Sequence, residues 1–234
     1  MKEAEMKAII LSSGGVDSTT CVSIAMNKHY DEIETVSVDY GQRHIKELKA
    51  AAEVAEYYGL YHTVIDLTGT RIYDRATTPL IAHNADTIPE ESYSDQINEN
   101  GTGKVSTYIP FRNGLMLAAL AGYAQSAFPD DDCDIYIGAH ADDAAGNAYA
   151  DCRPDFLSHM QQAIKIGTYE HVNVIYPLAT MNKASVVKLG IELETPYQLT
   201  WSCYKGGEKP CGKCGTCIDR ANAFKLNHIA DPAL

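Results

Sequence analysis

The residues with the clearest chemical potential stand at the end of the first apolar segment of the chain. They are Ser13-Gly14-Gly15-Val16-Asp17-Ser18, directly after the run Ala8 to Leu11. If that run is a strand and a helix opens at the motif, unpaired N–H groups and the helix dipole favour an anion there. The glycines permit close approach, the serines can donate hydrogen bonds, and Asp17 can cap the helix or help to hold Mg²⁺. The spacing predicts a phosphate-binding loop, with a plain Gly-Ser turn as the alternative.

This motif differs from two common nucleotide-binding loops. It is neither the Gly-x4-Gly-Lys-Ser/Thr loop of P-loop NTPases nor the Gly-x-Gly-x2-Gly loop of dinucleotide-binding proteins. Asp17 and Ser18 are candidate catalytic residues. We expect ATP to contact the whole stretch, namely Leu11, Ser12, Ser13, Gly14, Gly15, Val16, Asp17, Ser18 and Thr19.

Four of the seven cysteines are clustered in the pattern Cys203-x7-Cys211-x2-Cys214-x2-Cys217. Glycines between them permit the tight turns of a tetrahedral site, and four thiolates would close the coordination shell of a structural Zn²⁺. A redox-active C-x2-C pair and an iron–sulfur cluster are the alternatives. The remaining cysteines, Cys21, Cys133 and Cys152, are expected to be small buried side chains.

The elements that would position these residues alternate along the chain in the manner of βαβ units. Expected strands are Lys7–Ser12, Thr35–Tyr40, Tyr61–Asp66, Asp134–His140 and Asn173–Ile175. Expected helices are Ser18–Asn27, Ile45–Tyr58, Arg112–Phe128, Asp155–Ile166 and Lys183–Leu189. This pattern predicts a doubly wound parallel α/β sheet, with ligands at the carboxyl edge of the strands.

The length of 234 residues favours one main domain with a small appendage. We expect an α/β domain over residues 1–200 and a metal-binding subdomain over residues 201–234. The polar stretch Thr68 to Thr107 has no clear periodicity and predicts either a lid over the active site or a solvated insertion.

The composition and charge exclude several classes of function. A formal net charge of −12 leaves no broad basic surface, which disfavours stable binding of nucleic acid. The polar start, Met1 to Lys7, leads into an apolar run too short for a signal or membrane segment, so the sequence predicts a cytoplasmic protein that does not bind membranes.

Four further segments accompany the phosphate loop and the cysteine cluster in order along the chain. They are Asp39–His44, Ile109–Asn113, Asp151–Phe156 and Thr200–Tyr204. With them the chain resembles the PP-loop ATP pyrophosphatases, and within that superfamily the 7-cyano-7-deazaguanine (preQ0) synthases. The resemblance implies an adenine nucleotide alpha hydrolase-like fold with a small C-terminal zinc-binding subdomain. One departure lies in Gly138–Tyr149. Asp142 or Asp143 could bind Mg²⁺ or substrate there, with solvated loop residues as the alternative, and we assign them no catalytic role.

The resemblance also implies a reaction. The substrates would be ATP, 7-carboxy-7-deazaguanine and ammonia, and the enzyme would be a C–N bond-forming ligase of queuosine biosynthesis. It would adenylate the acid, form the amide, and adenylate the amide to yield the nitrile. Mg²⁺ and Zn²⁺ would be the metal ions, and the protein would be a homodimer.

Cations are required to neutralise the phosphate charge that develops during such a transfer. Arg112, Arg153 and Lys183 are the candidates, with a solvated lysine and structural ion pairs of the arginines as alternatives. For the substrate, Arg112 and Arg153 could meet the carboxylate, Asn113 a base edge, and Asp151 the exocyclic amine and ring N–H of a guanine-like base.

Rival functions use the same loop with other acceptors. A tRNA-modifying PP-loop enzyme would require an RNA-binding surface, which the acidic composition disfavours. An ammonia-dependent amide synthetase acting on another small acid would share the adenylation chemistry. A zinc-stabilised nucleotide-sensing module would leave the arginines and the lysine unexplained.

Overall fold

The computed structural model describes residues 5–93, 95, 96 and 103–234. At its centre is a parallel sheet, in the order β3-β2-β1-β4-β5. The strands are β1 (Met6–Leu11), β2 (Glu32–Asp39), β3 (Tyr61–Asp66), β4 (Asp132–Tyr136) and β5 (Val172–Ile175). Each expected strand is present, and the predicted doubly wound α/β fold is confirmed.

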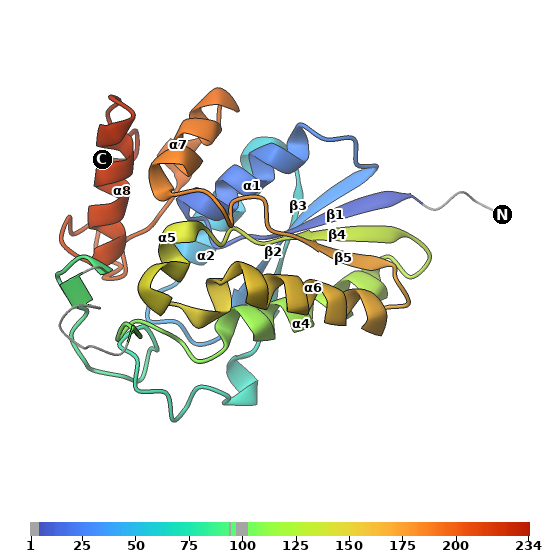
Figure 1. Ribbon diagram of the computed structural model, residues 1–234, viewed down its shortest axis with the longest axis horizontal. Helices are drawn as coiled ribbons and strands as arrows, with labels where there is room; N and C mark the ends of the chain where they lie inside the picture. The colour runs from blue at the N-terminus through green and yellow to red at the C-terminus, as the bar shows by residue number, and fades with distance from the viewer. Residues whose placement is uncertain (1–4, 94, 97–102) are drawn as a thin grey trace.

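Helices cover both faces of the sheet (Figure 1). On one face lie α1 (Val16–Met26), α2 (Lys46–Tyr58) and α7 (Lys183–Glu192), with α8 (Gly215–Leu226) packed beyond α7. On the other face lie α4 (Arg112–Ala127) and α6 (Pro154–Gly167). A short helix, α5 (Ala141–Ala144), follows β4.

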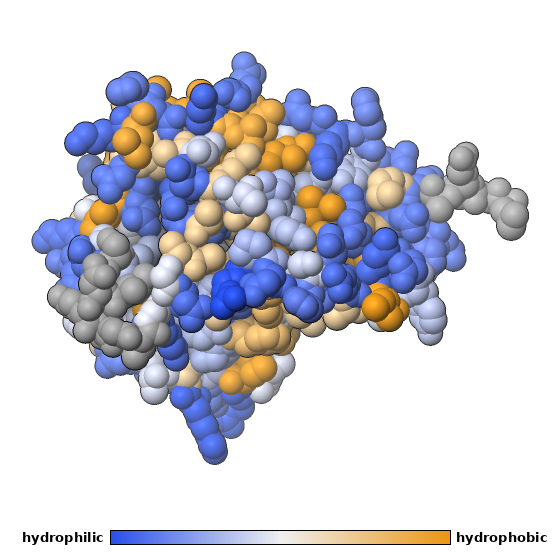
Figure 2. Space-filling model, viewed as in Figure 1, coloured by the Kyte–Doolittle hydropathy of each residue, from blue (hydrophilic) through white to orange (hydrophobic). Residues whose placement is uncertain are grey.

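The central strand shows why its sequence is apolar without alternation. Ile9 packs into the core beneath α4 and α6, whereas Ala8 and Ile10 pack into the core beneath α1 and α7. Because both faces of a parallel sheet are covered, the successive side chains from Lys7 to Ile10 are all buried. The outer surface is different: Figure 2 shows apolar residues scattered among hydrophilic ones on the face drawn there.

The strand order places a topological switch beside β1. The chain moves from β1 to β2 and β3 on one side, and β4 and β5 pair on the other side. The loops that follow β1 and β4 therefore diverge and leave a crevice at the carboxyl edge of the sheet. The phosphate motif lies in the first of these loops.

Some element bounds differ from those expected. β4 ends at Tyr136 rather than His140, since the chain turns there toward α1, and a Cβ on Gly138 would lie only 2.9 Å from the carbonyl carbon of Asp17. Helix α8 was not expected. It begins inside the cysteine cluster, where glycine and cysteine mask a helical pattern.

The stretch between Thr68 and Thr107 is more than a solvated insertion in the part that the structure describes; residues 94 and 97–102 lie outside that part. Leu80, Ile81 and Ile88 form a small core with Cys203 and Cys214. The insertion therefore packs on the cysteine-rich segment. Within the described residues no helix is both long and apolar enough to cross a bilayer.

The segment from residue 201 onward does not stand apart from the sheet. Ala223 and Phe224 of α8 belong to the core that contains Ile10 and Val22. The boundary near residue 200 remains a prediction, and the structure shows that the two parts share apolar packing.

Candidate active site

The phosphate loop leads into α1 and lies so close to α2 that one of its positions requires glycine. Gly14 has a φ of +70°, and a Cβ there would lie 2.5 Å from the backbone nitrogen of Ala51. The carbonyl oxygen of Gly14 accepts a hydrogen bond of 2.9 Å from the N–H of Trp201. The loop is thus held on one side by α2 and on the other by the segment that leads into the cysteine cluster.

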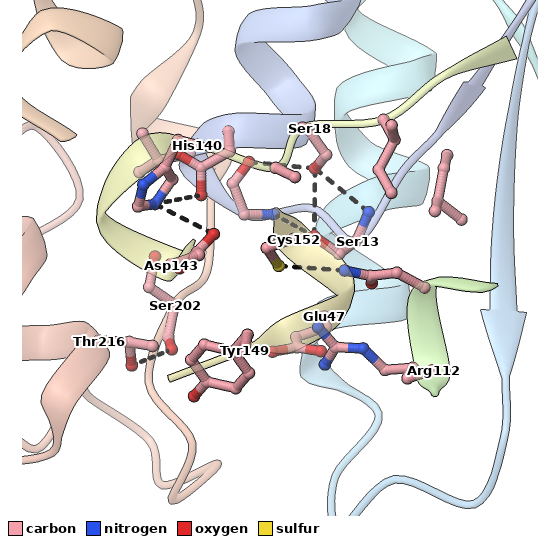
Figure 3. Close-up of a pocket in the computed structure, with 18 of the residues that line it drawn as sticks. Ser13, Ser18, Glu47, Arg112, His140, Asp143, Tyr149, Cys152, Ser202 and Thr216 are labelled. Carbon is pink, nitrogen blue, oxygen red and sulfur yellow. Dashed lines mark hydrogen bonds and ion pairs between the residues drawn. The ribbon is translucent and has the colours of Figure 1, made fainter. Parts of the chain in front are cut away.

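Serine side chains hold the loop around the start of α1. Gly15 is the N-cap residue, and the Ser18 hydroxyl donates to the Gly15 carbonyl oxygen at 3.2 Å. The N–H of Ser13 donates to Ser18 Oγ at 3.2 Å, and the two hydroxyls are 3.2 Å apart (Figure 3). The N–H of Gly15 donates to Ser13 Oγ at 3.4 Å, and a helix start held in this way can offer its remaining N–H groups to an anion.

A pocket opens at this loop and extends to α4. Of the stretch Leu11–Thr19 that we expected to contact ATP, all residues line the pocket except Gly14 and Thr19. Gly14 forms the turn beside α2, and Thr19 is fully buried in α1. The buried hydroxyl of Ser12 has no hydrogen-bond partner among the described residues.

A charged cluster lies at the start of α1. The ammonium nitrogen of Lys183 is 2.6 Å from Oδ1 of Asp17 and 3.4 Å from Nε2 of His140. His140 Nε2 is in turn 3.4 Å from Oδ2 of Asp143, as Figure 3 shows. Burial raises the pKa of Asp17, but the cation of Lys183, with a contribution from His140, outweighs it and lowers the pKa. Asp17 is therefore a carboxylate at neutral pH.

Asp219 adds a second acidic group from α8. It lines the same pocket as Asp17 and Asp143. Burial, opposed by the nearby Lys183, raises the pKa of Asp219 to about 6. Carboxylate oxygens are the protein ligands that Mg²⁺ prefers, so these side chains could help to hold Mg²⁺ beside bound phosphates.

The far end of the pocket is formed by the start of α4. Arg112 and Asn113 both line it, after Phe111 with a φ of 53°. The Asn113 N–H donates to Oδ2 of Asp151 at 2.9 Å, and its side-chain nitrogen donates to the Asp151 carbonyl oxygen at 3.2 Å. Asp151 therefore anchors Asn113 from behind and does not line the pocket.

Arg153 is not brought to the pocket lining either. Its side chain is 48% exposed, and its guanidinium pairs with Asp155 at 2.6 Å at the start of α6. This is the structural Asp–Arg pair that stood as the alternative for Arg153, although with Asp155 rather than Asp151.

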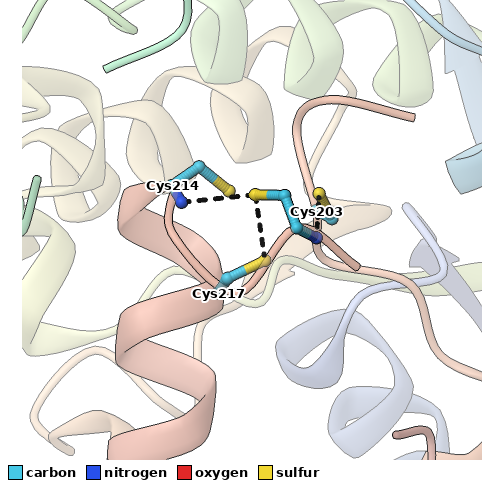
Figure 4. Close-up of side chains that lie close together, drawn as sticks. Cys203, Cys214 and Cys217 are labelled. Atoms are coloured by element: carbon cyan, nitrogen blue, oxygen red, sulfur yellow. Dashed lines mark hydrogen bonds between the residues drawn. The ribbon is translucent and has the colours of Figure 1, made fainter. Parts of the chain in front are cut away.

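The four cysteine sulfurs come together as expected. All lie within 4.8 Å of one another, and Figure 4 labels Cys203, Cys214 and Cys217 in this group. The sulfurs of Cys211 and Cys217 are 3.9 Å apart. That separation is far beyond a disulfide bond of about 2.05 Å. It matches the edge of about 3.8 Å expected for a tetrahedron with metal–sulfur bonds of about 2.3 Å. The cluster can hold one metal ion.

Backbone N–H groups surround this cluster. The N–H of Cys211 donates to the sulfur of Cys203 at 3.3 Å, and the N–H of Lys213 donates to the sulfur of Cys211 at 3.4 Å. Such hydrogen bonds stabilise thiolates and orient them toward a metal ion.

The cysteine cluster is joined to the pocket through the residues just before Cys203. Thr216 donates from its hydroxyl to the carbonyl oxygen of Ser202 at 2.7 Å, and both residues line the pocket. Arg220, held by Asp231 at 2.6 Å, donates to the Thr200 hydroxyl at 2.8 Å. Ordering the cysteines therefore orders one wall of the pocket.

Comparison with known proteins identifies the family. The model of the family described as "Queuosine biosynthesis protein QueC" matches residues 7–228. This chain belongs to the QueC family. A relative named 7-cyano-7-deazaguanine synthase, from Thermoplasma acidophilum, is 38% identical over 97% of this chain and 90% of its own length. Another of that name, from Pseudoalteromonas translucida, is 35% identical over 97% of each.

A solved structure extends the comparison of folds. The protein described as a "predicted subunit of tRNA methyltransferase" from Methanocaldococcus jannaschii has a TM-score of 0.50 at 16% identity, over 97% of this chain and 91% of its own. This similarity concerns the fold alone. Membership of the QueC family indicates an enzyme of queuosine biosynthesis.

The QueC pocket also contains residues that the sequence patterns did not single out for a role. Glu47 lies one helical turn after the Asp39–His44 segment, and Asp219 follows the last cysteine closely. His140 and Asp143 come from the loop after β4, which was set aside for departing from the family pattern. In the sequence, these residues could have been noticed only because they lie near recognised motifs. The fold shows that they face one cavity.

Proposed function

We propose that this chain converts 7-carboxy-7-deazaguanine and ammonia into 7-cyano-7-deazaguanine at the expense of ATP, through adenylated acid and amide intermediates. The observation that carries the proposal is the single pocket that joins the phosphate loop of α1 to Arg112 and Asn113 of α4 in a chain of the QueC family. A nucleotide and a small acid could meet there.

The first step is adenylation of the acid. A carboxylate oxygen attacks the α-phosphorus of ATP, the bond to the bridging oxygen breaks, and pyrophosphate leaves. The N–H groups at the start of α1 and the ammonium of Lys183 hold the phosphate oxygens and neutralise the charge that develops on them. Asp17 would help to hold Mg²⁺, and that ion would supply further positive charge to the leaving pyrophosphate. Ser18 keeps the loop in shape.

The second step replaces AMP by ammonia. The nitrogen attacks the acyl carbon, AMP departs with the original carboxylate oxygen, and a proton is lost to give the amide. The amide oxygen is then adenylated by a second ATP, and loss of AMP and two protons from nitrogen yields the nitrile. Each carboxylate oxygen thus leaves on an AMP molecule, and one site serves both activations because the amide replaces the acid in the same position.

The four cysteines support this chemistry from outside the pocket. Their close spacing favours a mononuclear site over an iron–sulfur cluster, whose thiolates ligate different irons and lie further apart. We assign the site to Zn²⁺, which would fix Trp201 and Ser202 against the phosphate loop. The proposal includes a homodimer, by family resemblance, which sedimentation can check.

The test incubates purified protein with Mg²⁺, ATP, ammonium and 7-carboxy-7-deazaguanine and follows the small molecules by liquid chromatography and mass spectrometry. The expected result is the nitrile with two AMP per molecule formed. ADP as the only nucleotide product would overturn the adenylation route. Zinc-loaded, folded protein that leaves the acid unconverted would overturn the assignment.

A further inference from the structure

The carboxylate of Glu47 faces the pocket without a partner. It lies in the first turn of α2, and among the described residues no hydrogen bond or ion pair within 4 Å joins it to another side chain. The exposed Glu53 of the same helix, in contrast, pairs with Lys49 at 3.7 Å. Glu47 is therefore an acceptor that the protein itself leaves unused.

The position of Glu47 is fixed by the backbone. Its carbonyl oxygen packs against the phosphate loop so closely that a Cβ on Gly14 would lie 2.6 Å from it. Trp201 also lines this pocket, and the ammonium nitrogen of Lys46 lies 4.3 Å from the centroid of its ring. A side chain that starts from such a fixed backbone is suited to recognition, because little order has to be gained on binding.

Arg112 is the charged group that faces Glu47 across this end of the pocket, as Figure 3 shows. Burial, opposed by the cation of Arg112, raises the pKa of Glu47 to about 7. The two side chains influence each other without forming an ion pair. Glu47 is half-buried, so its carboxylate has lost part of its hydration, and a ligand that brings donors to it gains binding energy.

The geometry of these two groups selects a ligand with donors on one edge and acceptors on the other. The two oxygens of a carboxylate match two adjacent, coplanar N–H groups, and a guanidinium matches two adjacent oxygens. A 7-carboxy-7-deazaguanine ring has its N1–H and 2-amino group on one edge. Its O6 and 7-carboxylate lie on the other.

We propose that Glu47 is the specificity-determining residue for the guanine-type edge, accepting from N1–H and the 2-amino group of the substrate. This inference rests on the proposed function and narrows it to one recognition contact. It also replaces Asp151, which the sequence suggested for this role, because the Asp151 carboxylate is taken up by the N–H of Asn113. Arg112 then receives the edge that carries O6 and the reacting carboxylate.

The test compares kcat/KM for two acids: 7-carboxy-7-deazaguanine and its analogue that lacks the 2-amino group. Wild type is expected to prefer the amino compound by about 10- to 100-fold, the discrimination typical of a bidentate hydrogen-bonded contact to a base edge. Glu47→Gln, which places an amide N–H against the 2-amino group, is expected to reduce this preference to below about 3-fold with KM for ATP unchanged. Glu53→Gln is the matched control and should behave as wild type.

The outcomes separate this inference from the function on which it rests. If wild type leaves both acids unconverted, the proposed function fails and the inference with it. If wild type turns over but Glu47→Gln keeps the full preference for the amino compound, Glu47 does not read that edge. A raised KM for ATP with an unchanged preference would assign Glu47 to the ribose hydroxyls of the nucleotide instead. Thermal melting and metal content of each variant establish that it is folded.

Discussion

The ammonium nitrogen of Lys183 lies 2.6 Å from Oδ1 of Asp17, which pairs the first residue of α7 with the second residue of α1. The backbone N–H of Lys183 is held as well, by Oδ2 of Asp142 at 2.7 Å. The ammonium group of Lys183 therefore lies at the start of α1 rather than extending into solvent. The start of α7 is held beside the loop that we propose binds the phosphates of a nucleotide.

Replacing this lysine tests its proposed role in charge neutralisation. Lys183→Met is expected to lower kcat for AMP formation about 100-fold or more, a loss typical for removal of a preorganised charge contact. Lys188→Met, an exposed residue of the same helix, should retain wild-type rates. Steady-state kinetics with AMP as the readout makes the comparison. Lys183→Met with more than about a third of wild-type kcat would show that the cation is structural.

Gly14 offers a test of the loop geometry. Gly14→Ala is expected to destabilise the protein by about 3 kcal/mol or more, because a Cβ would meet the backbone of α2 and the φ of +70° is unfavourable for alanine. Urea unfolding measures the change.

Gly122→Ala in α4 is the control, since a Cβ there has no heavy atom within 4 Å. That variant should be stabilised by about 0.5 to 1 kcal/mol. Equal effects of the two substitutions would contradict the close approach of the loop to α2.

Metal removal should be visible at the pocket. Trp201 is the only tryptophan of the chain, and it lies between the phosphate loop and Cys203. Chelation is expected to release one Zn²⁺ per chain, unfold the segment around the cysteines and shift the Trp201 emission to the red. Cys211→Ser should show the red-shifted emission of the chelated wild type even without chelator. Cys133→Ala, in the sheet core, is the control and should keep the metal. Unchanged emission after complete zinc release would show that the wall of the pocket holds without the ion.

Glu47 should make stability depend on pH. Its pKa is raised from an ordinary 4.5 to about 7 in the fold, so the folded chain binds more protons than the unfolded chain between these values. Stability from this group is present at low pH and is lost as pH rises through about 7. Glu47→Gln lacks this titration and should gain about 1 to 2 kcal/mol relative to wild type between pH 5.5 and 8, allowing for partial exposure.

Denaturant unfolding at the two pH values, without ligands, measures this difference. Glu53→Gln should track wild type at both, because its side chain is exposed on the same helix. A difference between Glu47→Gln and wild type that does not change with pH would show that Glu47 is charged throughout.

Local patterns in the sequence were sufficient for the strands, most helices, the loop between β1 and α1, and the convergence of the four cysteines. Apolar runs such as Ala8–Leu11 reflect burial on both faces of a strand, and the motif from Ser13 to Ser18 depends on neighbours within one turn. The cysteines are close in sequence, so their convergence needed only tight turns. Helix α8 was missed because it begins inside the cysteine cluster, with Cys214 as its N-cap and Gly215 and Cys217 in its first turn, so no helical pattern marks its start.

Only the tertiary structure decided which side chains share the pocket. Asp17, His140, Lys183 and Asp219 come from four separate segments, and their meeting depends on strand order, on the packing of α7 against α1 and on the packing of α8 against α7. On the other face of the sheet, contacts of residues 150–152 with α4 place Asp151 behind Asn113, and Arg153 remains at the surface with Asp155. A sequence determines which residues can do chemistry through their types and local spacing, but the direction in which each one points follows from long-range contacts that no local pattern encodes.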